Sequence, residues 1–80
     1  MMRQLHLIYS RQLTSAFEVH DAISRVLLGH VTFTIEHDKP GKFCFIPVGK
    51  KRGYPHATLL GALKEYFKTE VGVHFLPNVA

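Results

Sequence analysis

Cysteine and tryptophan are nearly absent from this 80-residue chain, which has one cysteine and no tryptophan. The lone Cys44 cannot form an internal disulfide, so the fold must hold without covalent cross-links, as is usual in a reducing compartment. The chain has no Cys-x-x-Cys pair, and none of its six histidines lies at a strong metal-ligand spacing from another ligand. We therefore expect no metal, no cofactor and a cytoplasmic location.

Long apolar runs are also missing. No segment approaches the roughly 18 residues that a membrane span requires, and the first ten residues, MMRQLHLIYS, lack the extended apolar segment of a signal peptide. Hydrophobic residues make up 46% of the chain and charged residues 20%, which is ordinary for a folded protein and argues against disorder. The length predicts a single domain, residues 1–80, without a membrane partner.

Acidic residues are few, with six Asp and Glu against ten Lys and Arg, giving a formal net charge of +4. The acids are scattered, and none has an evident partner for general acid–base work. The phosphate-binding pattern Gly-x-x-x-x-Gly-Lys-Ser/Thr is absent. We predict that the protein is not an enzyme, and the surplus of cations is compatible with a polyanionic partner.

Alternation of apolar and polar residues predicts four strands, over 3–9, 30–37, 43–48 and 71–77, with a turn at 38–42. A helix is predicted over 15–29, because Ser15-Ala16-Phe17-Glu18 has the form of a capping box and Gly29 is a good terminator. Its apolar side is Ala16, Val19, Ile23, Val26 and Leu27, and His20 lies at its edge. A second helix is predicted from Pro55, with Leu59, Leu60, Leu63 and Phe67 on its apolar side.

The resulting order, β-α-β-β-α-β, predicts a ferredoxin-like α+β domain, in which both helices cover one face of a four-stranded antiparallel sheet. If the more apolar set of each strand faces the helices, the core side is Leu5, Leu7, Tyr9, Val31, Phe33, Ile35, Cys44, Ile46, Val48, Val71, Val73 and Phe75. The open face then carries His6, Ile8, Thr32, Thr34, Phe43, Phe45, His74 and Leu76. His6 and His74 are expected to be neighbours there, which would make binding pH-sensitive.

The segment GKFCFIPV (41–48) resembles the third-strand signature of the RNA recognition motif, with Phe43 and Phe45 at its two aromatic positions. LHLIYS (5–10) more loosely resembles the first-strand signature, with His6 at the aromatic position. The resemblance implies that these three side chains stack on unpaired bases. The chain departs from the pattern in the reversed order of Gly41 and Lys42, in Pro47 within a central strand, and in His6 itself.

Three consecutive cations follow this strand in VGKKRGYP (48–55), between Gly49 and Gly53. A glycine-flanked basic loop before a helix suits phosphate groups. The predicted nucleic-acid-binding residues are therefore His6, Phe43, Phe45, Lys42, Lys50, Lys51 and Arg52.

The longer stretch IPVGKKRGYPHATLLGALK resembles part of the HicA family of RNA-cleaving toxins. That family carries its catalytic histidine in a Gly-Ser-His segment. This chain has Gly29-His30 without the serine, so no catalytic role is carried over, and His30 remains a residue to test.

Three functions stay open at this point. The first is a small basic module that binds single-stranded RNA or DNA through the open sheet face and the basic loop. The second is a protein-binding module, such as a small phage or mobile-element inhibitor or adaptor, that dimerises or docks through the same face or a sheet edge. The third is a HicA-like RNA-cleaving toxin. The first depends on the register of one strand, since core packing of Phe43 and Phe45 would remove the stacking platform.

Overall fold

The structure is a computed structural model that describes residues 2–11, 13, 15–35, 38 and 40–77. In these residues the chain forms a sheet of six strands and a single helix. The elements in chain order are β1 (Arg3–Tyr9), β2 (Ala16–Asp21), β3 (Leu27–Thr34), β4 (Lys42–Pro47), β5 (Pro55–His56), α1 (Leu59–Phe67) and β6 (Val71–Leu76).

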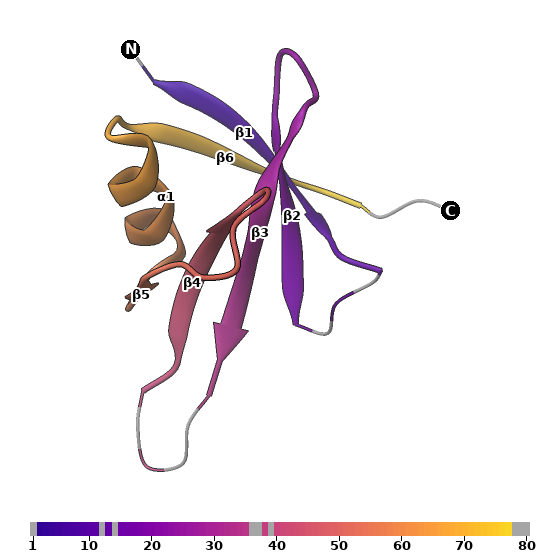
Figure 1. Cartoon of the computed structure of the whole chain (residues 1–80). Coiled ribbons are helices and arrows are strands. Elements are labelled where there is room, and N and C mark those ends of the chain that lie inside the picture. Colours follow the sequence, from indigo (N-terminus) through magenta and orange to yellow (C-terminus); the bar gives the residue numbers. More distant parts are fainter. Residues whose placement is uncertain (1, 12, 14, 36–37, 39, 78–80) are drawn as a thin grey trace.

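The sheet order is β5-β4-β3-β2-β1-β6. Strands β1 to β5 form an antiparallel meander, and β6 returns to pair in parallel with β1. Helix α1 makes this return and contacts β4 and β5 near one edge of the sheet and β6 at the other (Figure 1). The predicted ferredoxin-like fold is therefore wrong, because the sheet is mixed and six-stranded and one helix covers it. No helix in the described part of the chain is long and apolar enough to cross a membrane.

The predicted helix over 15–29 is replaced by β2, a turn and the start of β3. Val19 is fully buried because it lies between Leu7 of β1 and Gly29 of β3 in the ladders. The helical reading counted Ile23, which is 88% exposed. Phe17 and Val19 also alternate with Glu18 and His20, and this period of two fits a strand that is paired on both sides.

Asp21 is the last residue of β2 and starts the turn that leads to β3. Its carboxylate accepts a hydrogen bond from the Ser24 backbone N–H at 2.9 Å, and its backbone carbonyl accepts one from the Arg25 N–H at 2.8 Å. Its own N–H donates to the Val26 carbonyl at 3.0 Å, which closes the turn. Asp side chains favour such turns because they offer the backbone an alternative to helical hydrogen bonds.

The second predicted helix is confirmed, with a later start. Thr58 is the N-cap, and its hydroxyl accepts a hydrogen bond from the Gly61 N–H at 3.0 Å. Pro55 lies in β5, where the sequence predicted the first helical turn. The helix ends at Phe67, since Lys68 adopts a left-handed conformation with φ of 59°.

The predicted strand 3–9, the hairpin of β3 and β4, and the last strand are confirmed as β1, β3–β4 and β6. Lys39 in the predicted turn, with Glu36 and His37 before it, lies outside the described residues. The core between sheet and helix consists of Leu5, Leu7, Val19, Val31, Phe45, Ala62, Leu63 and Val71.

The side chains of strand β4 face the sides of the sheet opposite to those predicted. Phe45 is only 3% exposed and lies opposite Val31 in the β3–β4 ladder, on the side that α1 covers. Its ring centroid is 4.9 Å from that of Tyr66 and 5.5 Å from that of Phe67, both on the helix. Phe43 shares this face and packs against Phe33 at 4.7 Å. The placement of Phe43 and Phe45 on the open face is therefore wrong.

The reason lies in the composition of FCFIPV, in which both alternating sets are apolar. Alternation alone cannot choose between Phe43 with Phe45 and Cys44 with Ile46. Burial of an aromatic ring removes more apolar area from water than burial of a cysteine or isoleucine side chain does, and aromatic neighbours add to it.

We predict that Phe45→Ala lowers the free energy of unfolding by about 3–5 kcal/mol, because it empties a packed site beneath α1. The matched control is Phe75→Ala, which truncates a ring that is 58% exposed and should cost less than about 1 kcal/mol. Urea denaturation followed by far-UV circular dichroism measures both values. Equal losses for the two variants would contradict the register of β4.

The Asp21 carboxyl also predicts a pH dependence. The hydrogen bond from the Ser24 backbone N–H holds the pKa of Asp21 below its usual value, and Arg3 at 3.7 Å adds a smaller effect. A lowered folded-state pKa contributes stability above the unfolded-state pKa, and this contribution is lost as pH falls through the folded-state pKa. Asp21→Ala should therefore destabilise the protein at pH 7, and the difference from wild type should narrow toward pH 2. A difference that is constant over this range in urea denaturation would contradict the role of the charge.

Candidate nucleic-acid interface

The chain after β4 folds back over that strand. A turn begins with the hydrogen bond from the Lys50 N–H to the Pro47 carbonyl at 3.0 Å. Gly53 then passes so close to β4 that a Cβ atom there would lie 1.9 Å from the Phe45 carbonyl oxygen. Only glycine permits this close approach. Gly53 therefore allows the loop to lie against β4 beside the helix instead of extending into solvent.

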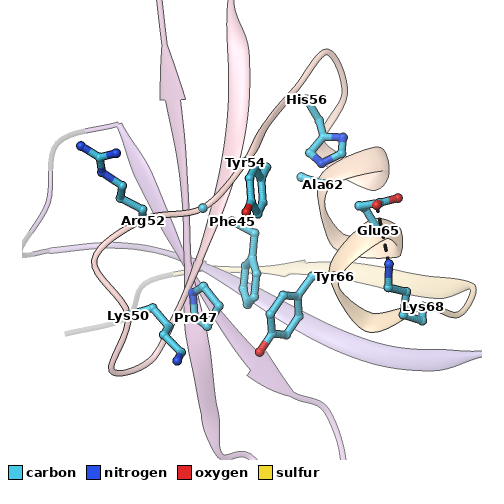
Figure 2. Close-up of a pocket in the computed structure, with 11 residues that line it drawn as sticks. Phe45, Pro47, Lys50, Arg52, Tyr54, His56, Ala62, Glu65, Tyr66 and Lys68 are labelled. Atoms are coloured by element: carbon cyan, nitrogen blue, oxygen red, sulfur yellow. Dashed lines mark ion pairs between the residues drawn. The ribbon is translucent and has the colours of Figure 1, made fainter.

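A cleft of about 460 Å³ lies between this loop and α1, and we call it the loop–helix cleft (Figure 2). Strand β4 contributes its floor, the loop with β5 contributes one wall, and the helix with its C-cap contributes the other. In that order the lining residues are Phe45, Pro47, Lys50, Arg52, Gly53, Tyr54, His56, Ala62, Glu65, Tyr66 and Lys68.

Two tyrosine rings are available at the cleft. Tyr54 on the loop is 84% exposed and Tyr66 on the helix is 50% exposed. Tyr66 is anchored on its inner side, since its ring packs on Phe45 and lies 5.0 Å from Phe67 in an edge-to-face arrangement. Figure 2 shows both tyrosines beside Phe45, with Tyr54 on the loop side. The cleft thus combines a buried aromatic floor with rings that an incoming planar group can contact.

The charges around the cleft are unevenly neutralised. Glu65 pairs with Lys68 at 3.6 Å, and Lys64 on the same helix pairs with Glu70 at 3.1 Å. Within the described residues no ion pair is formed by the three loop cations, Lys50, Lys51 and Arg52, which are all exposed. The loop side of the cleft therefore has a positive potential that the neighbouring acids do not cancel.

The structure brings only part of the predicted site together. Lys50 and Arg52 line the cleft, and Lys51 lies between them in the same loop. Lys42 pairs with Thr34 in the β3–β4 ladder, in register with the face opposite α1. His6 lies on that opposite face as well, so neither side chain lines the cleft with the loop cations.

Eight of the lining residues were not predicted, and they include three with aromatic rings: Tyr54, His56 and Tyr66. The sequence carried one signal for Tyr54, which follows the basic run after a single glycine, Gly53. Tyr66 was assigned to neither side of the predicted helix, and its place in a site follows only from the loop that folds back against that helix.

The opposite face of the sheet carries the predicted neighbours His6 and His74. They are paired in the β1–β6 ladder, and their ring centroids are 6.1 Å apart, so this adjacency is confirmed although the strands run parallel. His20 lies opposite His6 on β2, where the sequence predicted a helix. His30 lies opposite Glu18 on β3 and does not line the cleft.

Comparisons with protein-family models, curated proteins and solved structures find no match for this chain. Among the described residues, no group of three or more His, Cys, Asp or Glu side chains is placed to hold a metal ion.

Proposed function

We propose that the protein is a small module that binds single-stranded nucleic acid in the loop–helix cleft. The observation that carries the proposal is the placement of two exposed tyrosine rings, Tyr54 and Tyr66, beside loop cations that form no ion pair in the described structure. A cleft of about 460 Å³ is large enough for a small planar ligand such as a nucleobase with its sugar.

Each part of the cleft has a distinct task in this proposal. Unpaired bases stack on Tyr54 and Tyr66, and phosphates lie along Lys50, Lys51 and Arg52. Phe45 does not contact the bases but supports Tyr66 from below. Single strands are favoured over duplexes, because paired bases are already stacked on one another and cannot reach a protein ring.

This mode of recognition is tolerant of sequence, since every base has a face that stacks. The proposal therefore includes both RNA and DNA and requires binding without catalysis. The free thiol of Cys44 is consistent with action in a reducing cytoplasm, which we keep as the proposed location.

A protein partner is the second candidate, and the exposed edge strand β6 favours it. Its Phe75 is 58% exposed and joins an aromatic cluster with Phe17 at 5.4 Å, and Phe17 in turn contacts Tyr9 at 5.5 Å. No described strand pairs with the outer edge of β6, and such an edge beside apolar side chains is a common docking surface for another chain. No feature of the cleft favours the toxin hypothesis through His30, which lies outside it.

We predict that Tyr54→Ala weakens binding to a fluorescein-labelled oligouridylate roughly 5- to 150-fold, because loss of one stacking ring costs about 1–3 kcal/mol. The matched control is Tyr9→Ala, which removes a ring of 51% exposure that lies outside the cleft and should leave the affinity within about twofold. Fluorescence anisotropy at constant salt measures both affinities. Equal affinities for wild type and Tyr54→Ala would contradict stacking in the cleft, and absence of binding by wild type would favour the second candidate.

We further predict that binding weakens with salt and that the loop cations account for the dependence. On a plot of log affinity against log salt concentration, each single-strand phosphate contact contributes a slope of about −0.7. Lys50→Ala combined with Lys51→Ala should therefore make the slope shallower by about 1.4. Lys64→Ala serves as control, since this lysine is paired with Glu70 and does not line the cleft. A slope unchanged in the double variant would show that the phosphates lie elsewhere.

A further inference from the structure

The sheet face opposite α1 carries a row of histidines. In the ladders His74 of β6 lies opposite His6 of β1, which lies opposite His20 of β2. Directly opposite residues of neighbouring strands share a face and lie about 4.5–5.5 Å apart at Cβ. The three histidines thus form a row across the three neighbouring strands β6, β1 and β2 (Figure 1).

Gln4 and Gly72 complete this arrangement at the edge of the sheet. The His74 ring nitrogen Nε2 and the Gln4 side-chain oxygen are 2.7 Å apart, a hydrogen bond between neighbouring strands. Gly72 lies opposite Gln4 in the ladder, and a Cβ atom there would lie 2.4 Å from the same oxygen. The Gln4 side chain therefore lies over Gly72 of β6, where a Cβ atom would force its amide group to shift. We call Gln4, His6 and His74 the His–Gln cluster.

The other titratable groups on this face include one carboxylate, and it is bonded to a histidine outside the cluster. Glu18 is the one carboxylate that the described strands place there, and its oxygen lies 3.0 Å from the His20 Nε2. The other nitrogen of His20 is 3.4 Å from the Arg25 carbonyl. His30 lies opposite Glu18 on β3.

On β4 this face carries Lys42 and Cys44, which are separated from β1 by the two strands β2 and β3. Neither is a carboxylate, and Lys42 adds positive charge. When His6 and His74 are protonated, two cations therefore lie side by side. Glu18, the one carboxylate that the described strands place on this face, is diagonal to His6 in the β1–β2 ladder and is already bonded to His20.

We propose that the His–Gln cluster binds a tetrahedral oxyanion, a phosphate or sulfate group, when His6 and His74 are protonated. A protonated imidazole donates from both ring nitrogens, so His74 keeps its hydrogen bond to Gln4 through Nε2 and offers Nδ1–H. The Gln4 side-chain nitrogen carries two further donors. Bonds from charged donors to oxyanions are among the strongest hydrogen bonds in proteins, and a dianion relieves the repulsion between the two rings. Histidine charging between pH 5 and 8 makes the site pH-dependent.

The test is a histidine ring NMR titration of the full chain, recorded in sodium sulfate and in sodium chloride of equal ionic strength. Sulfate is the probe because it stays a dianion from pH 5 to 8, so only the protein changes charge. Selective binding to the protonated rings must raise the pKa of His6 and His74 in sulfate, and sulfate should bind at least about tenfold more tightly at pH 5.5 than at pH 7.5. His30 and His56 are the internal controls, and equal shifts at all four rings would overturn the proposal.

Two variants sharpen the result. Gln4→Ala keeps both rings and removes the amide donors, so it should reduce the sulfate effect on His74. An undiminished effect would overturn the assignment of Gln4. Repeating the titration with oligothymidylate in the Tyr54→Ala background distinguishes the source of the oxyanion. Shifts with both ligands assign the site to nucleic-acid phosphates, shifts with sulfate alone assign it to free oxyanions, and shifts with neither overturn it. The outcome is independent of binding in the loop–helix cleft.

Discussion

The packing of Phe45 against α1 is the interaction on which the rest of the structure depends. Its ring contacts Tyr66 and Phe67 of the helix, and it lies opposite Val31 in the sheet. Its backbone carbonyl is the surface over which Gly53 passes. One residue of β4 thus sets the position of the helix on one side and of the basic loop on the other. In a chain of 80 residues, which buries a smaller share of its surface than larger domains do, such a shared contact carries much of the core.

This constraint divides the sheet into two chemically different faces. The face covered by α1 is apolar and ends at the loop–helix cleft, where exposed tyrosines adjoin loop cations that form no ion pair with any residue the structure describes. The opposite face carries four histidines together with Glu18 and Gln4, namely His6, His20, His30 and His74. An aromatic strand that the sequence assigned to ligand contact is instead the foundation of the cleft. In the function that we propose, the ligand contacts come from Tyr54 and Tyr66, which lie above this strand, and from the cations of the loop.

The elements with one unambiguous period could be predicted from the sequence. Leu5 and Leu7 alternate with Gln4 and His6 in β1, and Leu59, Leu63 and Phe67 recur at helical spacing in α1. The segment Ala16–Asp21 fits both periods, and only its pairing with strands on both sides decides for β2. The topology was out of reach for the same reason, since a helix in place of β2 gives a different sheet order.

The charged residues of the candidate site could be predicted from the sequence, and its aromatic residues could not. The basic run that contains Lys50 and Arg52 can be predicted to be exposed whatever the fold, because three consecutive cations must be solvated. The choice of aromatic residues required the register of β4 and the close approach of Gly53 to Phe45, which are tertiary facts. Local alternation holds no information about either.

The most direct test of the cleft is a two-dimensional amide NMR titration with a short oligouridylate, which maps the bound surface residue by residue. The account predicts that the largest shift changes occur at residues 50–56 and at the cleft-facing side of α1, with Phe45 responding through its contact with Tyr66. Changes concentrated on β6, around Phe75, or on the histidine face at neutral pH would contradict it.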